Sequence, residues 1–382
     1  MKRICLWGTS LAKVGDAALL YAASKAVWSK MPDARITVFA RRGEVIERRY
    51  PEIKAIKTAR LDRVFARLLR SDLLVFVGGP FMEFPSQALS CFILYTMAKM
   101  LRVPVVTYGS TFIEYKTGWG KFFYRRLLEG MDAISVREKV GLTFLRSLGI
   151  KQDIHLFADP RFIVDRVSDE ELRSLLENEG IRQGEPLIGV TTRYMHSHMP
   201  VWIKRSHGYT EERARNAYRA IAQAVQAFDG IAQCVLIPMH PSYDSDVQTA
   251  ERIREHMTDP SKLKILKQSY GPMELLGILG VCELVIVSRL ASAVFGTIAA
   301  TPLLAVAYEP RMIGYMEQIG LRDYVEDWKG IEPDRFVESA KKAWSSREMI
   351  HKHLRPQVES LKASARKNAD IFSPFLGGGG KS

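Results

Sequence analysis

Two arginines that follow predicted strands are the sharpest candidates for chemistry in the sequence. Arg193 ends the apolar segment "LIGVTTR", and Arg289 ends "ELVIVSR" just before a helix rich in small residues. A planar guanidinium group offers a fork of N–H donors that matches a carboxylate or a phosphate. Arg289 also precedes a helix N-terminus, where backbone amides attract anions. We therefore expect the pair to bind an anion, with a structural ion pair as the alternative interpretation.

Other side chains extend this predicted site. Lys204 and Arg205 belong to a basic, aromatic stretch and are candidates for phosphate binding, with a solvated loop as the alternative. His240 ends the segment "QCVLIPMH" and is either a general acid or a structural histidine. His196 and His198 lie close in sequence, but no third ligand is identifiable, so we expect no metal site.

In the first half of the chain, glycines and one acid follow the predicted strands. The stretch "GTSLAKVGDAALL" contains Gly15 and Asp16 but matches neither a Walker A loop nor a GxGxxG fingerprint. Asp16 is either a binding residue or the N-cap of the next helix. Gly78 and Gly79 permit either close approach of a ligand to the backbone or a tight turn. These four residues form a second candidate binding site.

The elements that position these residues alternate between short apolar strands and helices, in one series from "RICLWG" to "HLFADP" and a second from "LIGVTTR". Continuous apolar strands are typical of parallel sheets covered by helices on both faces. We predict an α/β protein with two Rossmann-like, doubly wound domains, at residues 1–165 and 175–332. Residues 333–382 are predicted to form helices followed by a flexible tail. These helices are candidates for crossing back to the first domain. In such sheets ligands bind beyond the carboxyl ends of the strands, where the strand-end candidates lie.

Composition narrows the class of protein. A hydrophobic content of 47% over 382 residues excludes a disordered chain. No apolar run reaches the ~18 residues of a transmembrane helix, and the N-terminus lacks a signal-peptide pattern. The four cysteines have no CxxC spacing and lie in apolar segments, so we predict that they are buried and reduced. These features favour a cytoplasmic protein.

The formal charge of +13 indicates anionic partners. The charge is concentrated at residues 60–70 and 116–128. The first segment carries four arginines at helical spacing: Arg60, Arg63, Arg67 and Arg70. The second mixes basic and aromatic residues, a composition typical of a membrane interface, although a solvated helix over core aromatics has the same pattern. No nucleic-acid motif accompanies the charge, so peripheral contact with an anionic membrane is the hypothesis that we carry forward.

Four segments carry a resemblance to a known family: "GTSLAKVGDAALL", "LVFVGGPF", "DAISVREKVGLTFLRSLGI…ADP" and "ILGVCELVIVSRLASAVFGTIAATPLLAVAYEPRMIGYMEQIGL". They resemble the polysaccharide pyruvyl transferase family, including its colanic-acid biosynthesis branch. Known members have two Rossmann-like domains in a GT-B-like arrangement. They join pyruvate from phosphoenolpyruvate to two hydroxyls of one sugar as a cyclic ketal and release phosphate. The resemblance therefore implies a transferase with phosphoenolpyruvate as donor, no further cofactor, and a free or polyprenyl-linked glycan as acceptor.

By position, the resemblance puts Arg193 and Arg289 on the carboxylate and phosphate of phosphoenolpyruvate, with Leu290 and Arg311 nearby. The glycine-bearing strand ends of the first domain would then serve the acceptor. The family's histidine, a proton donor by its chemistry, falls at position 291, where this sequence has Ala291.

Three explanations fit the alanine. It is an inactivating substitution in an otherwise intact site, the acid is a different residue such as His240, or the chain is a non-catalytic relative. Two other functions therefore stay open beside pyruvyl transfer: a GT-B glycosyltransferase that uses a nucleotide sugar, and a glycan-binding protein without activity.

Overall fold

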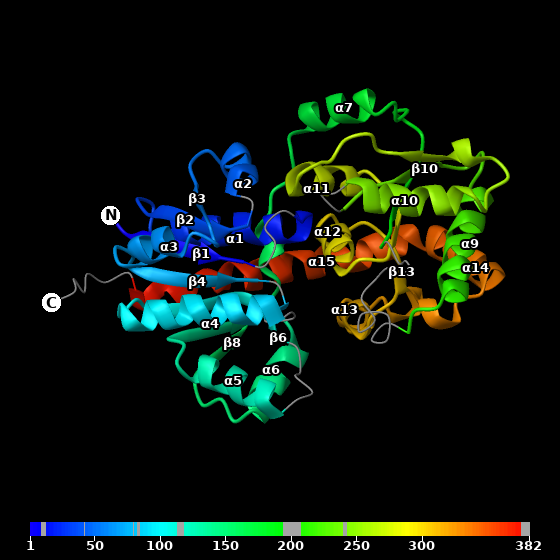
Figure 1. Ribbon diagram of the computed structural model, residues 1–382. Helices are drawn as coiled ribbons and strands as arrows, with labels where there is room; N and C mark the ends of the chain where they lie inside the picture. The colour runs from blue at the N-terminus through cyan, green and yellow to red at the C-terminus, as the bar shows by residue number, and fades with distance from the viewer. Residues whose placement is uncertain are drawn as a thin grey trace. The chain divides into compact units, whose positions relative to one another are not determined.

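The computed structural model divides the chain into two compact units (Figure 1). The structure describes residues 1–8, 13–41, 43–78, 80–81, 85–112, 118–193, 208–239 and 243–375. The first unit comprises Met1–Val164 and the described residues from Ser360 onward, and the second comprises Asp165–Glu359. The predicted C-terminal segment 333–382 is thus divided, because its residues up to Glu359 belong to the second unit.

The first unit is built on a parallel sheet in the order β3-β2-β1-β4-β6-β7-β8, with β5 paired to β6. The strands are β1 (Arg3–Trp7), β2 (Arg35–Ala40), β3 (Lys54–Lys57), β4 (Leu73–Val77), β5 (Pro80–Phe81), β6 (Val105–Phe112), β7 (Ala133–Val136) and β8 (Ile154–Leu156). Every residue of the central strand β4 is buried, as expected for a sheet with both faces covered.

Helices cover both faces of this sheet. They are α1 (Val14–Lys30), α2 (Gly43–Arg49), α3 (Leu61–Leu68), α4 (Pro85–Met100), α5 (Gly118–Glu129), α6 (Lys139–Ser147), and the 3-10 segments η1 (Pro160–Ile163) and η5 (Lys367–Phe375). On one face, η5 brings Phe372 to stack on Tyr108 with ring centroids 5.6 Å apart. On the other face, side chains of α3, α4, α5 and α6 share one core with strand residues such as Trp7 and Phe76.

The second unit repeats the architecture with a parallel sheet in the order β11-β10-β9-β12-β13-β14. Its strands are β9 (Leu187–Thr191), β10 (Gln233–Leu236), β11 (Leu263–Ile265), β12 (Leu284–Val287), β13 (Leu303–Ala307) and β14 (Val325–Asp327). Its helices are α7 (Asp169–Asn178), α9 (Glu211–Ala227), α10 (Tyr243–Arg254), α11 (Pro272–Gly280), α12 (Leu290–Ile298), α13 (Pro310–Gln318), α14 (Pro333–Ser345) and the first part of α15 (Arg347–Arg366), with the 3-10 segments η2 (Pro260–Lys262), η3 (Arg322–Tyr324) and η4 (Trp328–Gly330).

These two parallel sheets with alternating helices confirm the predicted α/β fold class. Ser168 caps α7, and its hydroxyl accepts a hydrogen bond from the Glu171 amide at 3.2 Å. All four cysteines are buried and free, as predicted. No helix in the described ranges combines the length and apolar composition needed to span a bilayer.

Candidate active site

The two predicted anion-binding arginines follow neighbouring strands in the middle of the second sheet. Strands β9 and β12 pair in parallel, with Thr191 opposite Val287, and the Ser288 amide donates to the Thr191 carbonyl at 3.0 Å. Arg193 and Arg289 each stand two residues beyond this pair. Because parallel strands end at the same edge, the register brings both arginines to the carboxyl edge of the sheet.

The Arg289 side chain is held from two sides. Its Nε donates to the Thr192 carbonyl at 2.8 Å, and its Nη2 donates to Asp246 Oδ1 at 2.5 Å. Asp246 is fully buried near the start of α10, and its Oδ2 accepts the Met239 amide at 2.8 Å. A guanidinium group has five N–H donors, so three of them have no hydrogen-bond partner among the described residues and are available to a ligand. The side chain is 20% exposed, which gives a ligand access to it.

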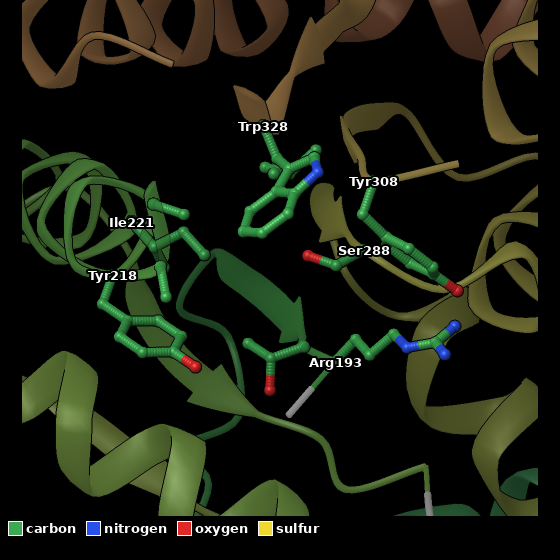
Figure 2. A pocket seen from close by; sticks show the side chains of 10 residues that line it. Arg193, Tyr218, Ile221, Ser288, Tyr308 and Trp328 are labelled. Atoms are coloured by element: carbon green, nitrogen blue, oxygen red, sulfur yellow. The ribbon is translucent and has the colours of Figure 1, made fainter. Parts of the chain in front are cut away.

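The Arg193 guanidinium lies over the ring of Tyr308, 4.3 Å from its centroid (Figure 2). The Tyr308 hydroxyl donates to Glu309 Oε1 at 3.3 Å, and Glu309 Oε2 accepts Arg311 Nη2 at 2.8 Å. Burial raises the pKa of Tyr308 and Glu309 adds to the shift, while the positive charges of Arg193 and Arg289 oppose it. Tyr308 is therefore a neutral platform for Arg193 near pH 7.

The N-terminus of α12 adds backbone donors beside Arg289. Arg289 occupies the N-cap position, but its side chain makes no capping hydrogen bond. The buried Ser292 hydroxyl instead donates to the Arg289 carbonyl at 2.8 Å and pairs with Thr191 Oγ1 at 2.7 Å, which fixes the turn. Leu290 and Ala291 form the partly exposed first turn of the helix. A bound anion is favoured here by the helix dipole, but Ala291 contributes only a methyl group.

A small cavity adjoins these residues at the same edge of the sheet (Figure 2). Its volume is about 30 Å³, and it is lined by Thr192, Arg193, Ala214, Ala217, Tyr218, Ile221, Ser288, Val306, Tyr308 and Trp328. Thr192 Oγ1 is buried and has no hydrogen-bond partner among the described residues. The cavity has room for a water molecule or a methyl group.

Several predicted site residues cannot be placed in this arrangement. Lys204, Arg205, His240 and Gly79 lie outside the described residues, as do His196 and His198. The structure therefore brings together Arg193, Arg289, Leu290, Ala291 and Arg311 from the predicted set. Among the described residues, no three His, Cys, Asp or Glu side chains are positioned to share a metal ion.

In the first unit, the predicted binding glycine Gly78 has a structural explanation. Its φ is +49°, and a Cβ atom at this position would stand 2.4 Å from Leu19 Cδ1 on α1. Helix α1 begins at Val14 with Lys13 as its N-cap, so the interpretation of Asp16 as the N-cap is wrong. Asp16 and Gly15 belong to the first turn of α1, where an acidic side chain interacts favourably with the helix dipole.

Sequence reasoning missed a buried charge cluster at the carboxyl edge of the first sheet. Arg161 Nη2 lies 2.6 Å from Asp159 Oδ2, and Arg137 Nη1 lies 3.3 Å from the same oxygen. Arg137 Nε also donates to Thr111 Oγ1 at 2.8 Å. Burial alone would raise the pKa of Asp159, but the charges of Arg161 and Arg137 hold it well below its usual range. The "SVR" and "ADP" segments thus meet in a network that fixes these strand ends.

The comparisons with known proteins agree with this fold. The chain is similar to a glycosyltransferase from Rickettsia africae (TM-score 0.63, 14% identity, 98% of this chain and 99% of that one). It is also similar to the UDP-GlcNAc 2-epimerase of Methanocaldococcus jannaschii (TM-score 0.62, 13% identity, 90% and 92% covered). The ADP-heptose LPS heptosyltransferase II of E. coli matches with a TM-score of 0.54, at 16% identity over 91% of this chain and 100% of that one. At these identities the likeness concerns the GT-B-like fold alone.

Sequence comparison is more specific. The amylovoran biosynthesis protein AmsJ of Erwinia amylovora is 22% identical over 247 residues, which cover 63% of this chain and 58% of AmsJ. The chain therefore spans little more than half the length of that relative. The family model for polysaccharide pyruvyl transferase matches residues 14–310, a range that includes Arg193, Arg289 and Ala291. The chain belongs to the polysaccharide pyruvyl transferase family.

Proposed function

We propose that the chain binds phosphoenolpyruvate at the carboxyl edge of its second sheet and that this site serves pyruvyl transfer to a glycan. The acceptor would be a sugar of a bacterial polysaccharide or of its lipid-linked precursor. The observation that carries the proposal is the pair Arg193 and Arg289, which follow adjacent strands in a chain of this family. A carboxylate and a phosphate on one small molecule match two arginine forks and a helix N-terminus.

The size of the adjoining cavity supports a small donor. A volume of about 30 Å³ beside Arg193 accommodates a methylene or methyl group. Carbon C3 of phosphoenolpyruvate is a methylene that becomes a methyl group in the ketal.

Transfer forms two C–O bonds at C2 of the donor, the first by addition and the second by substitution of the phosphate. A proton added to C3 produces an oxocarbenium-like centre at C2, which the first sugar hydroxyl captures. The first hydroxyl loses its proton, which balances the proton added to C3. Phosphate then leaves C2, the oxygen of the second hydroxyl bonds to C2 in its place and closes the ketal, and the proton of that hydroxyl ends on the phosphate. Arg193 and Arg289 would bind the donor and stabilise charge on the leaving phosphate. The described residues of this site offer no histidine as proton donor, because position 291 is alanine and His240 lies outside the described residues.

Thermal denaturation with candidate ligands tests the proposal. Phosphoenolpyruvate at about 100 times its dissociation constant should stabilise the chain by ~2.7 kcal/mol. Arg193→Ala and Arg289→Ala should each abolish that shift while the ligand-free melting temperature changes little for Arg193→Ala. UDP-GlcNAc and ADP-heptose serve as comparison ligands.

The same experiment separates the alternatives. Stabilisation by a nucleotide sugar and not by phosphoenolpyruvate would assign the chain to glycosyl transfer. Stabilisation by neither donor, together with binding of a glycan acceptor, would identify a glycan-binding protein without transferase activity.

A further inference from the structure

The helices on one face of the first sheet expose an unusual share of large apolar side chains. In the described part of the chain, eight of the fourteen exposed side chains of this type belong to α3–α6 or their ends. These eight are Leu61, Phe65, Leu69, Leu89, Phe92, Met100, Phe122 and Val140. The second unit contributes only three of the fourteen exposed side chains. Single exposed apolar residues are ordinary, but a concentration on one helical layer marks an interaction surface.

Helix α3 shows how this surface is built. Val64 and Leu68 face the core, whereas Leu61, Phe65 and Leu69 are 44%, 40% and 51% exposed. Residues at a spacing of four lie on one side of a helix. The three exposed side chains therefore form a stripe beside the buried face of α3.

The same layer holds most of the excess positive charge. Residues 60–70, 85–102, 118–129 and 138–147, which contain α3–α6, carry eleven lysines and arginines and three acids. Arg60, Arg125 and Lys99 are paired with Asp62, Glu129 and Asp132. The remaining charge includes four exposed arginines that form no ion pair with a described residue: Arg63, Arg70, Arg102 and Arg126.

The structure divides residues 116–128 between the two interpretations of that segment. Tyr124 is fully buried in the core of the first unit, so it does not belong to an interfacial cluster. Phe122, by contrast, is 54% exposed. The side chains of Trp119 and Phe123 lie outside the described part of the structure. The apolar and basic surface therefore extends over α3 and α4 and is not confined to this segment.

We propose that the outer surface of α3–α6 docks on an anionic phospholipid membrane. Apolar side chains would enter the headgroup boundary while arginines contact lipid phosphates, as in interfacial amphipathic helices. A second copy of the chain is a poorer occupant, because self-association through this surface would oppose two strongly basic layers. This inference does not depend on pyruvyl transfer, and its test uses no substrate.

Co-sedimentation of the full chain with vesicles tests the charge component. The chain should bind vesicles that contain phosphatidylglycerol, and binding should fall as added salt shortens the screening length. The variant Arg63→Gln/Arg70→Gln/Arg126→Gln should lower the partition coefficient by about 100-fold, at ~1 kcal/mol for each basic residue. The control variant Arg173→Gln/Arg322→Gln/Arg355→Gln removes the same charge from exposed positions of the second unit and should bind almost as well as the parent.

A second pair of variants tests the apolar component. Phe65→Ser/Phe122→Ser should weaken vesicle binding, whereas Ile231→Ser/Met349→Ser, at exposed positions of the second unit, should not. Equal binding to phosphatidylcholine vesicles, equal losses in both arginine variants, or no binding at low salt would overturn the proposal. Concentration-dependent dimerisation that Phe65→Ser/Phe122→Ser abolishes, without vesicle binding, would instead assign the surface to a second copy.

Discussion

The buried carboxylate of Asp246 orients the Arg289 guanidinium. One carboxylate oxygen accepts Arg289 Nη2 at 2.5 Å, and the other accepts the Met239 amide at 2.8 Å. The carboxylate is thereby fixed to the segment that follows β10 (Gln233–Leu236), and the arginine is fixed to the carboxylate. An arginine held in this way needs little reorganisation to receive an anion, which is how supporting residues improve a binding site.

Asp246→Asn should therefore weaken phosphoenolpyruvate binding by at least about tenfold, because the amide cannot pair with the guanidinium charge. In an Arg289→Gln background the same change should add little further loss, since residues that act together are not additive. Isothermal titration of the four proteins measures both effects. Asp323→Asn, at an exposed position of the same unit, is the control. Unchanged affinity in Asp246→Asn would show that Arg289 needs no such support.

Variants of Arg193 and Tyr308 distinguish the contribution of the positive charge from that of the planar guanidinium group stacked on the ring. Arg193→Lys retains the charge but loses the planar fork and the ring contact, so donor affinity should fall about tenfold or more. Tyr308→Leu should weaken binding several-fold through loss of a cation–π contact of ~1 kcal/mol. Tyr308→Phe retains the ring and should bind almost normally. If Tyr308→Phe is as damaging as Tyr308→Leu, the hydroxyl and not the ring supports Arg193.

Variants of Gly78 test whether the packing of the first unit requires a glycine at this position. Gly78→Ala combines a positive φ of +49° with a contact to Leu19 at 2.4 Å, so it should lower the free energy of unfolding by about 1–3 kcal/mol. Leu19→Ala should relieve the steric contact, so the double variant should lose less stability than the sum of the losses of the two single variants. Additive losses would indicate that α1 does not require glycine at this position.

Much of this fold is predictable because its central strands carry a simple signal. Strands such as β4 and β12 are continuous apolar runs, and they are followed by Gly78 and by Ser288 and Arg289. The edge strand β3, "KAIK", has exposed ends and no continuous apolar run, so its pattern does not distinguish it from a loop. The short helix α2 buries only Gly43 and Ile46 of its seven residues, which leaves little periodicity to detect.

The candidate site likewise contains some features that the sequence predicts and others that it does not. Arg193 and Arg289 are predictable because strand ends and helix starts are local features of the sequence. The pairing of Arg289 with Asp246 joins residues 43 positions apart and depends on how α10 packs. An aspartate near a helix N-terminus is ordinarily explained by the helix dipole alone. Its complete burial, which makes it a partner for arginine, is a property of the tertiary structure.

The buried thiols predict a pH dependence of stability. Burial raises the pKa of Cys5 from 9.0 to about 11, although Ser71 and Arg67 oppose the shift. Between these values the unfolded chain has lost the thiol proton while the native chain keeps it, so stability falls as pH rises. For one thiol the loss approaches ~1.4 kcal/mol per pH unit. The melting temperature should therefore fall less between pH 8 and pH 10 for Cys5→Ala than for the parent chain. An equal fall in the two proteins would contradict a raised pKa of Cys5.

Position 291 offers the most direct test of catalysis. Ala291 lies in the first turn of α12, two residues after Arg289 and beside the backbone amides that would face a bound phosphate. Histidine at this position could hold a proton near neutral pH, and a phosphate dianion would favour its protonated form. Because a positioned general acid contributes about 10²–10⁴-fold, Ala291→His should raise phosphate release from phosphoenolpyruvate by at least ~10²-fold when the correct glycan is present.

Donor affinity is the control for this substitution, since Arg193 and Arg289 are unchanged and binding should alter much less than turnover. Ala291→Gln adds a polar side chain of similar reach that cannot donate a proton as an acid, so it should leave turnover low. A parent chain that is already fully active, and that gains nothing from the histidine, would show that the proton comes from another residue. His240 would then be the first candidate, because it follows the neighbouring strand β10, and His240→Gln should abolish the activity of the alanine chain.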